Sequence, residues 1–115
     1  MTERRVVDAG DIVWVDFDPI RGTEQGGTRP AYILTGRDFH ALSARAIVCP
    51  ITRSEGAWPT KVPLPDGMKT KGAILVDQVR AVDRSQRGFR YIERAPDEVL
   101  AEVRAILGAL LRLTP

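Results

Sequence analysis

The chain of 115 residues is long enough for one domain with a single hydrophobic core and too short for a multidomain enzyme, so we expect one domain over residues 1–115. Its composition, 43% hydrophobic and 28% charged residues, is typical of a soluble globular protein and excludes a disordered or fibrous one. The net charge is only +2, but residues 21–94 carry thirteen Lys and Arg against seven Asp and Glu, a local net charge of +6. This basic centre favours an anionic polymer over a membrane surface as partner, although a solvated, arginine-rich surface explains it equally well.

The chain contains one cysteine, Cys49, and one histidine, His40. A single cysteine excludes an intramolecular disulfide and a cysteine-based zinc cluster, and it suggests a reducing compartment. A single histidine excludes an acid–base mechanism with two histidines, and we interpret His40 as a surface or structural residue. Asp16 and Asp18 alternate on one strand without further carboxylates, which is a weak magnesium signal. We therefore expect neither a metal ion nor another cofactor.

Nothing in the sequence indicates a targeting or membrane segment. The first ten residues lack the apolar stretch of a signal peptide, and the apolar run over residues 105–111 is far too short to span a membrane. We expect a cytoplasmic protein with no membrane partner.

Short runs rich in β-branched and aromatic residues alternate with Gly, Pro and Asp through most of the chain, which is typical of a small all-β barrel or sandwich. The predicted strands are Ile12–Phe17, Ala31–Thr35, Ala46–Thr52, Lys61–Leu64, Ala73–Val76 and Val79–Val82. Pro19 and Pro30 enclose a loop with three glycines, which allow the main chain to approach a ligand closely. A plain hairpin connection explains the same loop without a function.

From Val99 to Leu111 the apolar residues recur at spacings of three and four, which predicts an amphipathic helix. Pro96 fits the first helical position, and the acidic residues after it suit the positive end of the helix dipole. We expect the apolar stripe to pack on the sheet, with a partner-binding helix as the alternative. A short helical turn is predicted over Asp38–Ser43 with Asp38 as its cap, so the expected fold class is mainly β with a C-terminal α-helix.

Three polar residues lie on the glycine-rich loop or at the ends of predicted strands: Glu24, Arg29 and Thr52. Arg29 directly precedes Pro30, which restricts the backbone and presents the guanidinium at a rigid strand edge. If the strand ends are neighbours, the three side chains can grip a phosphate, with Arg29 on the anion, Thr52 as hydroxyl donor and Glu24 as base. Taken singly, each is better explained as a solvated loop charge or a polar residue at a strand end.

Two adjacent segments, Gly10–Pro19 (GDIVWVDFDP) and Gly22–Ala31 (GTEQGGTRPA), resemble the MazF/PemK family of toxin endoribonucleases. Val48–Thr52 (VCPIT) is similar to the second catalytic block of that family, Gly72–Arg80 (GAILVDQVR) to its third, and the terminal helix to its ending. The resemblance covers nearly the whole chain in the expected order, and the pairing of the first two motifs is highly specific.

The resemblance implies an SH3-like barrel, a homodimer, and metal-independent cleavage of single-stranded RNA at short sequences by the toxin of a type II toxin–antitoxin system. In such enzymes the 2′-hydroxyl attacks the adjacent phosphate and leaves a 2′,3′-cyclic phosphate and a 5′-hydroxyl. On this interpretation Arg29 stabilises the charge that develops on the phosphate, Thr52 holds a phosphate oxygen, and Glu24 is the candidate base. Which group is the base and which the acid stays open.

The resemblance also implies an RNA-binding set: Trp14, Asp16, Phe17, Gln25, Arg53, Asp77 and Gln78. Aromatic rings stack on unpaired bases, while carboxylates and amides bind base edges. For Trp14 a core position in the first strand is the alternative. Some relatives carry a catalytic arginine two residues before this Asp77, where the present chain has Leu75, so the sequence favours the mechanism based on Arg29 and Thr52.

A toxin of this family pairs with a MazE-like antitoxin whose acidic, disordered tail occupies the basic groove and blocks RNA. Two alternatives remain. One is a CcdB-like toxin of the same fold that poisons DNA gyrase by protein contact, and the other is a catalytically silent relative that binds RNA or antitoxin. The complete loop motif and the Pro50–Thr52 block argue against gyrase poisoning, and RNA cleavage without metal would separate the enzyme from the silent relative.

Overall fold

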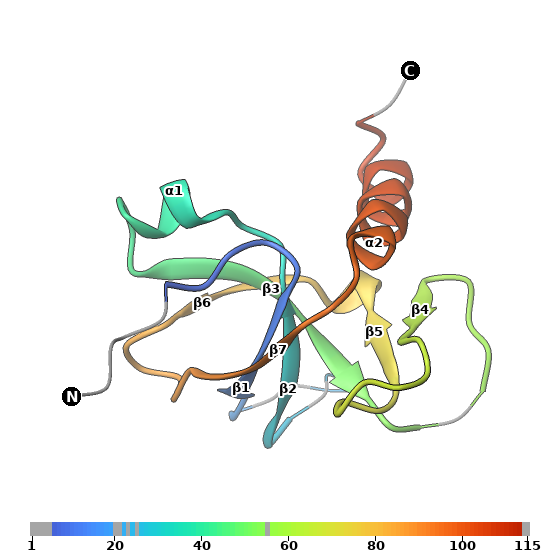
Figure 1. The fold of residues 1–115 in the computed structure, drawn as a ribbon, viewed down its shortest axis with the longest axis horizontal. Coiled ribbons are helices and arrows are strands. Elements are labelled where there is room, and N and C mark those ends of the chain that lie inside the picture. Colours follow the sequence, from blue (N-terminus) through green and yellow to red (C-terminus); the bar gives the residue numbers. More distant parts are fainter. Residues whose placement is uncertain (1–5, 20–21, 23, 25, 55, 114–115) are drawn as a thin grey trace.

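The structure, a computed structural model, describes residues 6–19, 22, 24, 26–54 and 56–113. This part of the chain folds into seven strands, two α-helices and one 3₁₀ helix, η1 (Figure 1). In chain order the elements are β1 (Asp11–Asp16), β2 (Thr28–Ile33), α1 (Arg37–His40), β3 (Arg45–Thr52), β4 (Lys61–Pro63), β5 (Ala73–Leu75), η1 (Val76–Gln78), β6 (Arg80–Asp83), β7 (Arg90–Arg94) and α2 (Asp97–Leu110).

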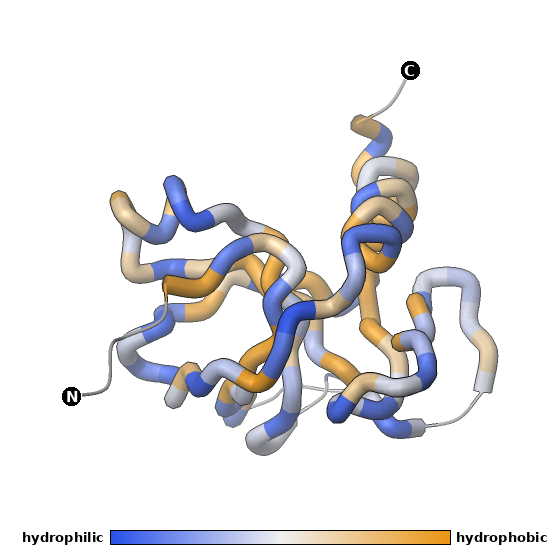
Figure 2. Tube along the Cα trace, in the orientation of Figure 1, coloured by the Kyte–Doolittle hydropathy of each residue, from blue (hydrophilic) through white to orange (hydrophobic). Residues whose placement is uncertain are grey.

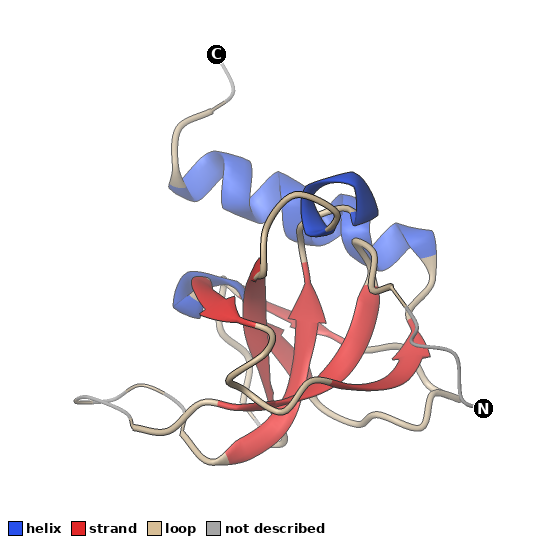
Figure 3. Ribbon diagram, turned by 90° about the vertical axis from the view of Figure 1, so that its left-hand side faces the viewer, coloured by secondary structure: helices blue, strands red, loops and turns tan. Residues whose placement is uncertain are grey.

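The seven strands form one antiparallel sheet in the order β4-β5-β3-β2-β1-β7, and β6 pairs with β3 beside this path. β3 is the shared strand: Arg45–Val48 pair with β6, Val48–Pro50 with β2, and Ile51–Thr52 with β5. The sheet therefore curls around β3, and Figure 3 shows its twisted strands with α2 lying across one end. This architecture confirms the predicted fold class, a small, mainly β structure with a C-terminal helix.

The alternation of side chains along β1 feeds two core clusters on its two faces. Ile12 and its register partner Tyr32 belong to the first cluster, whereas Val13, Val15 and Phe17 belong to the second. Figure 2 shows the hydrophobic stretches concentrated on the central strands and recurring along α2. Because Asp11–Val13 of β1 and Ala31–Ile33 of β2 are buried, these strands form a rigid platform for the residues at their other ends.

α2 packs on the first core cluster through Val99 and Val103, as its periodicity predicts, but it begins one residue later than expected. Pro96 has extended dihedral angles (φ −58°, ψ 151°) and is the N-cap, so its prediction as the first helical residue is wrong. The cause is the preceding residue: the Ala95 N–H donates to the Gly10 carbonyl at 3.1 Å, which keeps the chain extended up to Pro96. None of the described helices has the length and apolar character needed to cross a membrane.

The short helix α1 spans Arg37–His40 rather than the predicted Asp38–Ser43. Gly36, in an extended conformation, is its N-cap and makes no side-chain capping bond. The Asp38 carboxylate instead accepts a hydrogen bond from the main-chain N–H of Phe39, so the prediction of Asp38 as cap is wrong.

His40 is a structural residue, one of the two roles that the sequence suggested. Its Nδ1 lies 2.7 Å from the carbonyl oxygen of Val7, and its Nε2 lies 2.7 Å from Oγ1 of Thr35. Both ring nitrogens are therefore engaged in tying the segment before β1 to the sheet.

The sequence does not predict β7, whose residues Arg90–Arg94 are mostly charged and largely exposed. β7 is an edge strand that pairs with β1 alone, so it has little apolar surface to bury and shows no clear alternation. Its position matters for the site described below, because Ile92 lines that site and Glu93 holds a loop that lines it.

Candidate active site

Arg29 and Thr52 lie side by side at the ends of β2 and β3. Ala31 of β2 pairs with Pro50 of β3, and continuing this antiparallel register by two residues puts Arg29 directly opposite Thr52. The guanidinium is held by two main-chain acceptors: Nε donates to the carbonyl of Gly26 at 2.9 Å, and Nη1 donates to the carbonyl of Ile51 at 3.4 Å. The strand ends that carry Arg29 and Thr52 are therefore neighbours, as the sequence analysis assumed.

Thr52 contacts the loop that follows β3 and the neighbouring strand β5. It is only 3% exposed, and its Oγ1 accepts a hydrogen bond from the Ser54 N–H at 3.1 Å. Gly72, immediately before β5, has φ +123°, and a Cβ atom at this position would lie 2.1 Å from the Thr52 carbonyl oxygen. Only glycine permits that approach, so Gly72 lets the chain before β5 pack directly against the main chain of Thr52.

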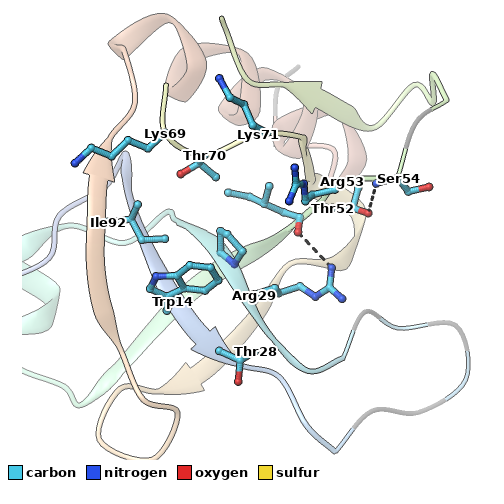
Figure 4. Close-up of a pocket in the computed structure, with 12 residues that line it drawn as sticks. Trp14, Thr28, Arg29, Thr52, Arg53, Ser54, Lys69, Thr70, Lys71 and Ile92 are labelled. Carbon is cyan, nitrogen blue, oxygen red and sulfur yellow. Dashed lines mark hydrogen bonds between the residues drawn. The ribbon is translucent and has the colours of Figure 1, made fainter. Parts of the chain in front are cut away.

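A pocket of about 700 Å³, here called the central pocket, opens beside Arg29 and Thr52 (Figure 4). It is lined by Trp14, Thr28, Arg29, Pro30, Ile51, Thr52, Arg53, Ser54, Lys69, Thr70, Lys71 and Ile92. Four of these residues are Arg or Lys, and no described residue of the lining is acidic. The concentration of positive charge, with hydroxyl groups and an indole beside it, suits a phosphate and an unpaired base.

Trp14 forms a wall of the central pocket. Figure 4 shows Trp14 and Ile92 on one side, while Arg29 extends on the other side toward the end of β3. The Arg90 guanidinium carbon lies 5.9 Å from the centroid of the indole, a cation–π contact that restrains the ring. The ring is half-buried at a pocket surface, so the alternative of a simple core residue does not describe it.

The cationic segment Lys69–Lys71, between β4 and β5, is anchored by Glu93 of β7. The Glu93 carboxylate accepts hydrogen bonds from the Lys69 N–H at 3.2 Å, the Thr70 N–H at 2.6 Å and the Thr70 hydroxyl at 2.6 Å. Burial by itself raises the pKa of Glu93, but the hydrogen bonds from Thr70 and Lys69 outweigh it and hold the pKa below its ordinary value. Glu93 does not line the central pocket itself, but it positions the segment that brings Lys69 and Lys71 to the pocket.

The loop between β1 and β2 is anchored at its base. Asp18 Oδ1 accepts from the Gly27 N–H at 2.8 Å, and the Phe17 N–H donates to the Gly27 carbonyl at 3.0 Å. Arg87 donates to the main-chain carbonyls of Asp16 and Asp18, and Asp16 Oδ1 accepts from the Asp18 N–H at 3.0 Å. Asp16 therefore supports the loop, and its contact with RNA stays a prediction.

A second pocket of about 430 Å³, here called the flanking pocket, contains other residues that the sequence singled out. It is lined by Phe17, Pro19, Glu24, Pro50, Asp77, Gln78, Val79 and Arg80. Glu24 lines this pocket with Asp77 and Gln78, whereas Arg29 and Thr52 line the central pocket, so the expected cluster of three spans two adjoining pockets. The two pockets are neighbours, because Pro50 lies two residues before Thr52 on β3 and both side chains point to the same face.

Phe17 is fully buried in the second core cluster, and the Arg80 guanidinium carbon lies 5.7 Å from its ring centroid. The strand alternation that buries Val15 also turns Phe17 inward, so its ring is covered in this structure and the expected stacking surface is not presented. Gln25 lies outside the described residues. Leu75, two residues before Asp77, is buried in the core and carries no charge.

Cys49, the one cysteine of the chain, is not placed for catalysis by a thiolate. Burial, and secondarily the charge of Asp77, raise the pKa of Cys49 to about 12, so its thiol stays protonated at neutral pH. The described residues contain no group of three or more His, Cys, Asp or Glu side chains placed to hold a metal ion.

A profile of the family described as "PemK-like, MazF-like toxin of type II toxin-antitoxin system" matches residues 8–111. The chain belongs to this toxin family. The match includes every described strand, both α-helices and both pockets, so it extends over the whole candidate site.

Individual members of the PemK/MazF family agree. The endoribonuclease toxin MazF of Escherichia coli (strain K12) is 33% identical over 111 residues, which are 96% of this chain and 99% of that protein. The crystal structure of MazF from Deinococcus radiodurans has a TM-score of 0.90 at 38% identity, over 95% of this chain and 99% of that one. A MazE–MazF structure from the same organism has a TM-score of 0.86 at 38% identity, over 96% and 100%. These relatives give no support to the alternative of a gyrase-poisoning toxin.

The PemK/MazF motifs account for Trp14, Arg29 and Thr52 but not for Lys69, Lys71 or their anchor. The only sequence signal for these lysines is two positive charges at a spacing of two in a loop between predicted strands. Only the folded chain shows that this loop closes one side of the central pocket.

Proposed function

We propose that this PemK/MazF toxin acts as an endoribonuclease, as its curated relatives are named, and that it cleaves single-stranded RNA at short sequences without a metal ion. The observation that carries the proposal is the central pocket, where Arg29 and Thr52 lie side by side and three further cationic side chains line the same space. Unpaired bases reach the indole of Trp14 in such a pocket, whereas stacked bases of a duplex do not.

The reaction is a transfer within the RNA strand. The 2′-oxygen attacks the adjacent phosphorus, the bond from phosphorus to the 5′-oxygen breaks, and the ends are a 2′,3′-cyclic phosphate and a 5′-hydroxyl. One proton leaves the 2′-hydroxyl and one reaches the departing 5′-oxygen, so the balance requires a base and an acid but no water.

Arg29 has an electrostatic role in this reaction. A guanidinium stays charged and donates only, so it stabilises the negative charge that builds up on the non-bridging oxygens of the phosphate. Its bonds to the Gly26 and Ile51 carbonyls fix its orientation before the substrate arrives. The Thr52 hydroxyl holds a phosphate oxygen beside it, and Arg53 contacts a neighbouring phosphate.

Glu24 is the proposed base for the 2′-hydroxyl. An RNA strand that runs from Thr52 toward Pro50 along one face of β3 passes from the central to the flanking pocket and meets Glu24 there. Asp77 and Gln78 line the same pocket, and their carboxylate and amide suit contacts with base edges.

The first experiment incubates the purified protein with a long single-stranded transcript in EDTA and maps the new ends. We expect cuts at a recurring short sequence with 5′-hydroxyl ends, and a loss of rate on the order of 10²–10³-fold in Arg29→Ala. Arg45→Ala is the matched control, because Arg45 is exposed at the opposite end of β3 and its removal changes the net charge equally. Absence of cleavage by folded wild-type protein would refute the enzymatic proposal.

The role of Glu24 has a separate test. Glu24→Gln keeps the size of the side chain but removes its basicity, so we expect the rate to fall on the order of 10²–10⁴-fold while the affinity for RNA stays the same. A loss of affinity as large as the loss of rate would show that Glu24 binds the substrate and is not the base.

The biological partner of this toxin is proposed to be a MazE-like antitoxin with an acidic tail. The net charge of +6 over residues 21–94 and the cations of the central pocket support a competition between this tail and RNA for one surface. The proposal also includes a homodimer in the cytoplasm. Leu110 and Leu111, apolar and exposed at the end of α2, support burial against a second copy, and sedimentation of the purified protein tests it.

A further inference from the structure

A third pocket of about 590 Å³, here called the distal pocket, adjoins the central pocket between the β3–β4 connection and the start of β5. Arg53, Ser54 and Lys71 line both pockets, so the two are continuous. The residues that belong to the distal pocket alone include Trp58 and Lys61, which neither the family motifs nor the mechanism uses.

The side chains of the distal pocket repeat the chemistry of the central one. Trp58 is 61% exposed, whereas tryptophan side chains are highly buried on average. It lies among the cations Arg53, Lys61 and Lys71, and no described residue of this lining is acidic. An exposed indole among cations is the arrangement that single-stranded nucleic acid binds, by stacking of a base and by charge on the backbone.

The turn that carries Trp58 is ordered by Lys61. The Lys61 N–H donates to the Trp58 carbonyl at 3.0 Å, and Nζ of Lys61 donates to the Gly56 carbonyl at 3.1 Å. The indole is therefore presented by a closed turn, which lowers the entropic cost of holding it against a ligand.

We propose that the distal pocket binds a nucleotide of the RNA substrate beyond the one at Arg29 and Thr52, with its base stacked on Trp58 and its phosphate near Lys61 and Lys71. This inference rests on the proposed function and extends it, because continuity with the central pocket identifies the occupant as the same strand. Trp58 then contributes to the choice of cleavage sequence through a contact away from the reacting phosphate.

The test uses a fluorescent 12-nucleotide RNA of random sequence with 2′-O-methyl groups, which cannot be cleaved because the attacking hydroxyl is blocked. Loss of base stacking should lower the affinity on the order of 5- to 100-fold in Trp58→Ala. Trp58→Phe keeps an aromatic ring and should retain most of the wild-type affinity. Phe39→Ala is the matched control, because Phe39 is also an exposed aromatic residue but lies on α1, outside all three pockets.

Two further measurements report on the same contact. In Trp14→Phe, Trp58 is the remaining tryptophan, and its fluorescence should be quenched as the RNA is added. In Lys61→Ala the slope of log affinity against log salt should fall by about 0.7, the value for one phosphate contact on a single strand, whereas Arg45→Ala should leave it unchanged.

The outcomes separate this inference from the proposed function. If the wild type cleaves a long transcript but Trp58→Ala binds the 12-mer as tightly as Phe39→Ala does, the distal pocket is not an RNA site. The same conclusion follows if Trp58 fluorescence responds to an acidic peptide but not to RNA. If the affinity depends on Trp58 and the wild type cuts no RNA, the nucleotide site stands while the enzymatic proposal fails. Equal melting temperatures of Trp58→Ala and wild type show that lost affinity is not lost folding.

Discussion

Replacing Glu93 with alanine tests whether one carboxylate positions the cationic side of the central pocket. Glu93 accepts hydrogen bonds from the Lys69 N–H and from both the N–H and the hydroxyl of Thr70. Thr70 is only 6% exposed, so its donors lose their partner in a place that water reaches poorly. A buried donor left without a partner costs about 1–3 kcal/mol, and we expect Glu93→Ala to lower the free energy of unfolding by about 2 kcal/mol.

That free energy has a measurable thermal equivalent. The entropy of unfolding of a chain of this length is on the order of 0.24 kcal/mol/K, so about 2 kcal/mol lowers the melting temperature by about 8 °C. The experiment is thermal unfolding followed by circular dichroism at pH 7, with Glu102→Gln as control, because Glu102 is exposed on α2. The affinity for the uncleavable 12-mer should fall as well, since Lys69 and Lys71 lose their anchor.

The pH dependence adds a second, independent readout. The pKa of Glu93 is lower in the folded chain than its ordinary value. Its contribution to stability is therefore fully present above the unfolded-state pKa, near 4.5, and is lost as the pH falls through the lower folded-state pKa. Between pH 6 and pH 3 the melting temperatures of wild type and Glu93→Gln should converge. A drop of less than about 2 °C in Glu93→Ala at pH 7, or a difference that stays constant with pH, would refute the reasoning.

Three further predictions concern the fold around the site. Cys49, with its pKa raised to about 12, should not react with a disulfide reagent at pH 8 until the chain unfolds, and rapid labelling of native protein would contradict its burial. Gly72→Ala should lower the melting temperature by well over 10 °C and abolish cleavage, because its Cβ would meet the Thr52 carbonyl at 2.1 Å, whereas Gly67→Ala, at φ +92° with open space around it, should cost only about 1 kcal/mol. His40→Ala should cost about 2 kcal/mol in urea denaturation, since two hydrogen bonds at a buried position are lost, and an unchanged midpoint would rule out its structural role.

Local patterns in the sequence were sufficient for the central elements. The runs of β-branched and aromatic residues in Ile12–Phe17 and Ala46–Thr52 predict β1 and β3 closely, because most side chains of these two strands are buried. The spacing of apolar residues from Val99 onward predicts α2 and its packing for the same reason. The pairing of Arg29 with Thr52 follows once neighbouring antiparallel strands are assumed.

Features that depend on contacts between distant segments were beyond the sequence. β7 is an exposed edge strand, so its residues carry no periodicity that selection for burial would impose. Glu93 and Lys69 come from two loops or edges that only the closed sheet brings together. Glu24 is a similar case, because its closeness to Arg29 along the chain does not reveal that it lines the neighbouring pocket.

The pairing of β1 with β7 affects when the protein acquires its site. β1 lies between β2 and β7, so the first strand of the sheet cannot complete its pairing until β7, the last strand, has been synthesised. Chains fold from the N-terminus as they emerge from the ribosome, but Ile92 and Glu93 emerge after every other residue that shapes the central pocket. A growing chain therefore has no complete cationic groove until synthesis has passed residue 94, and the ribosome that makes this protein carries an incomplete form of the proposed RNA site for most of that time.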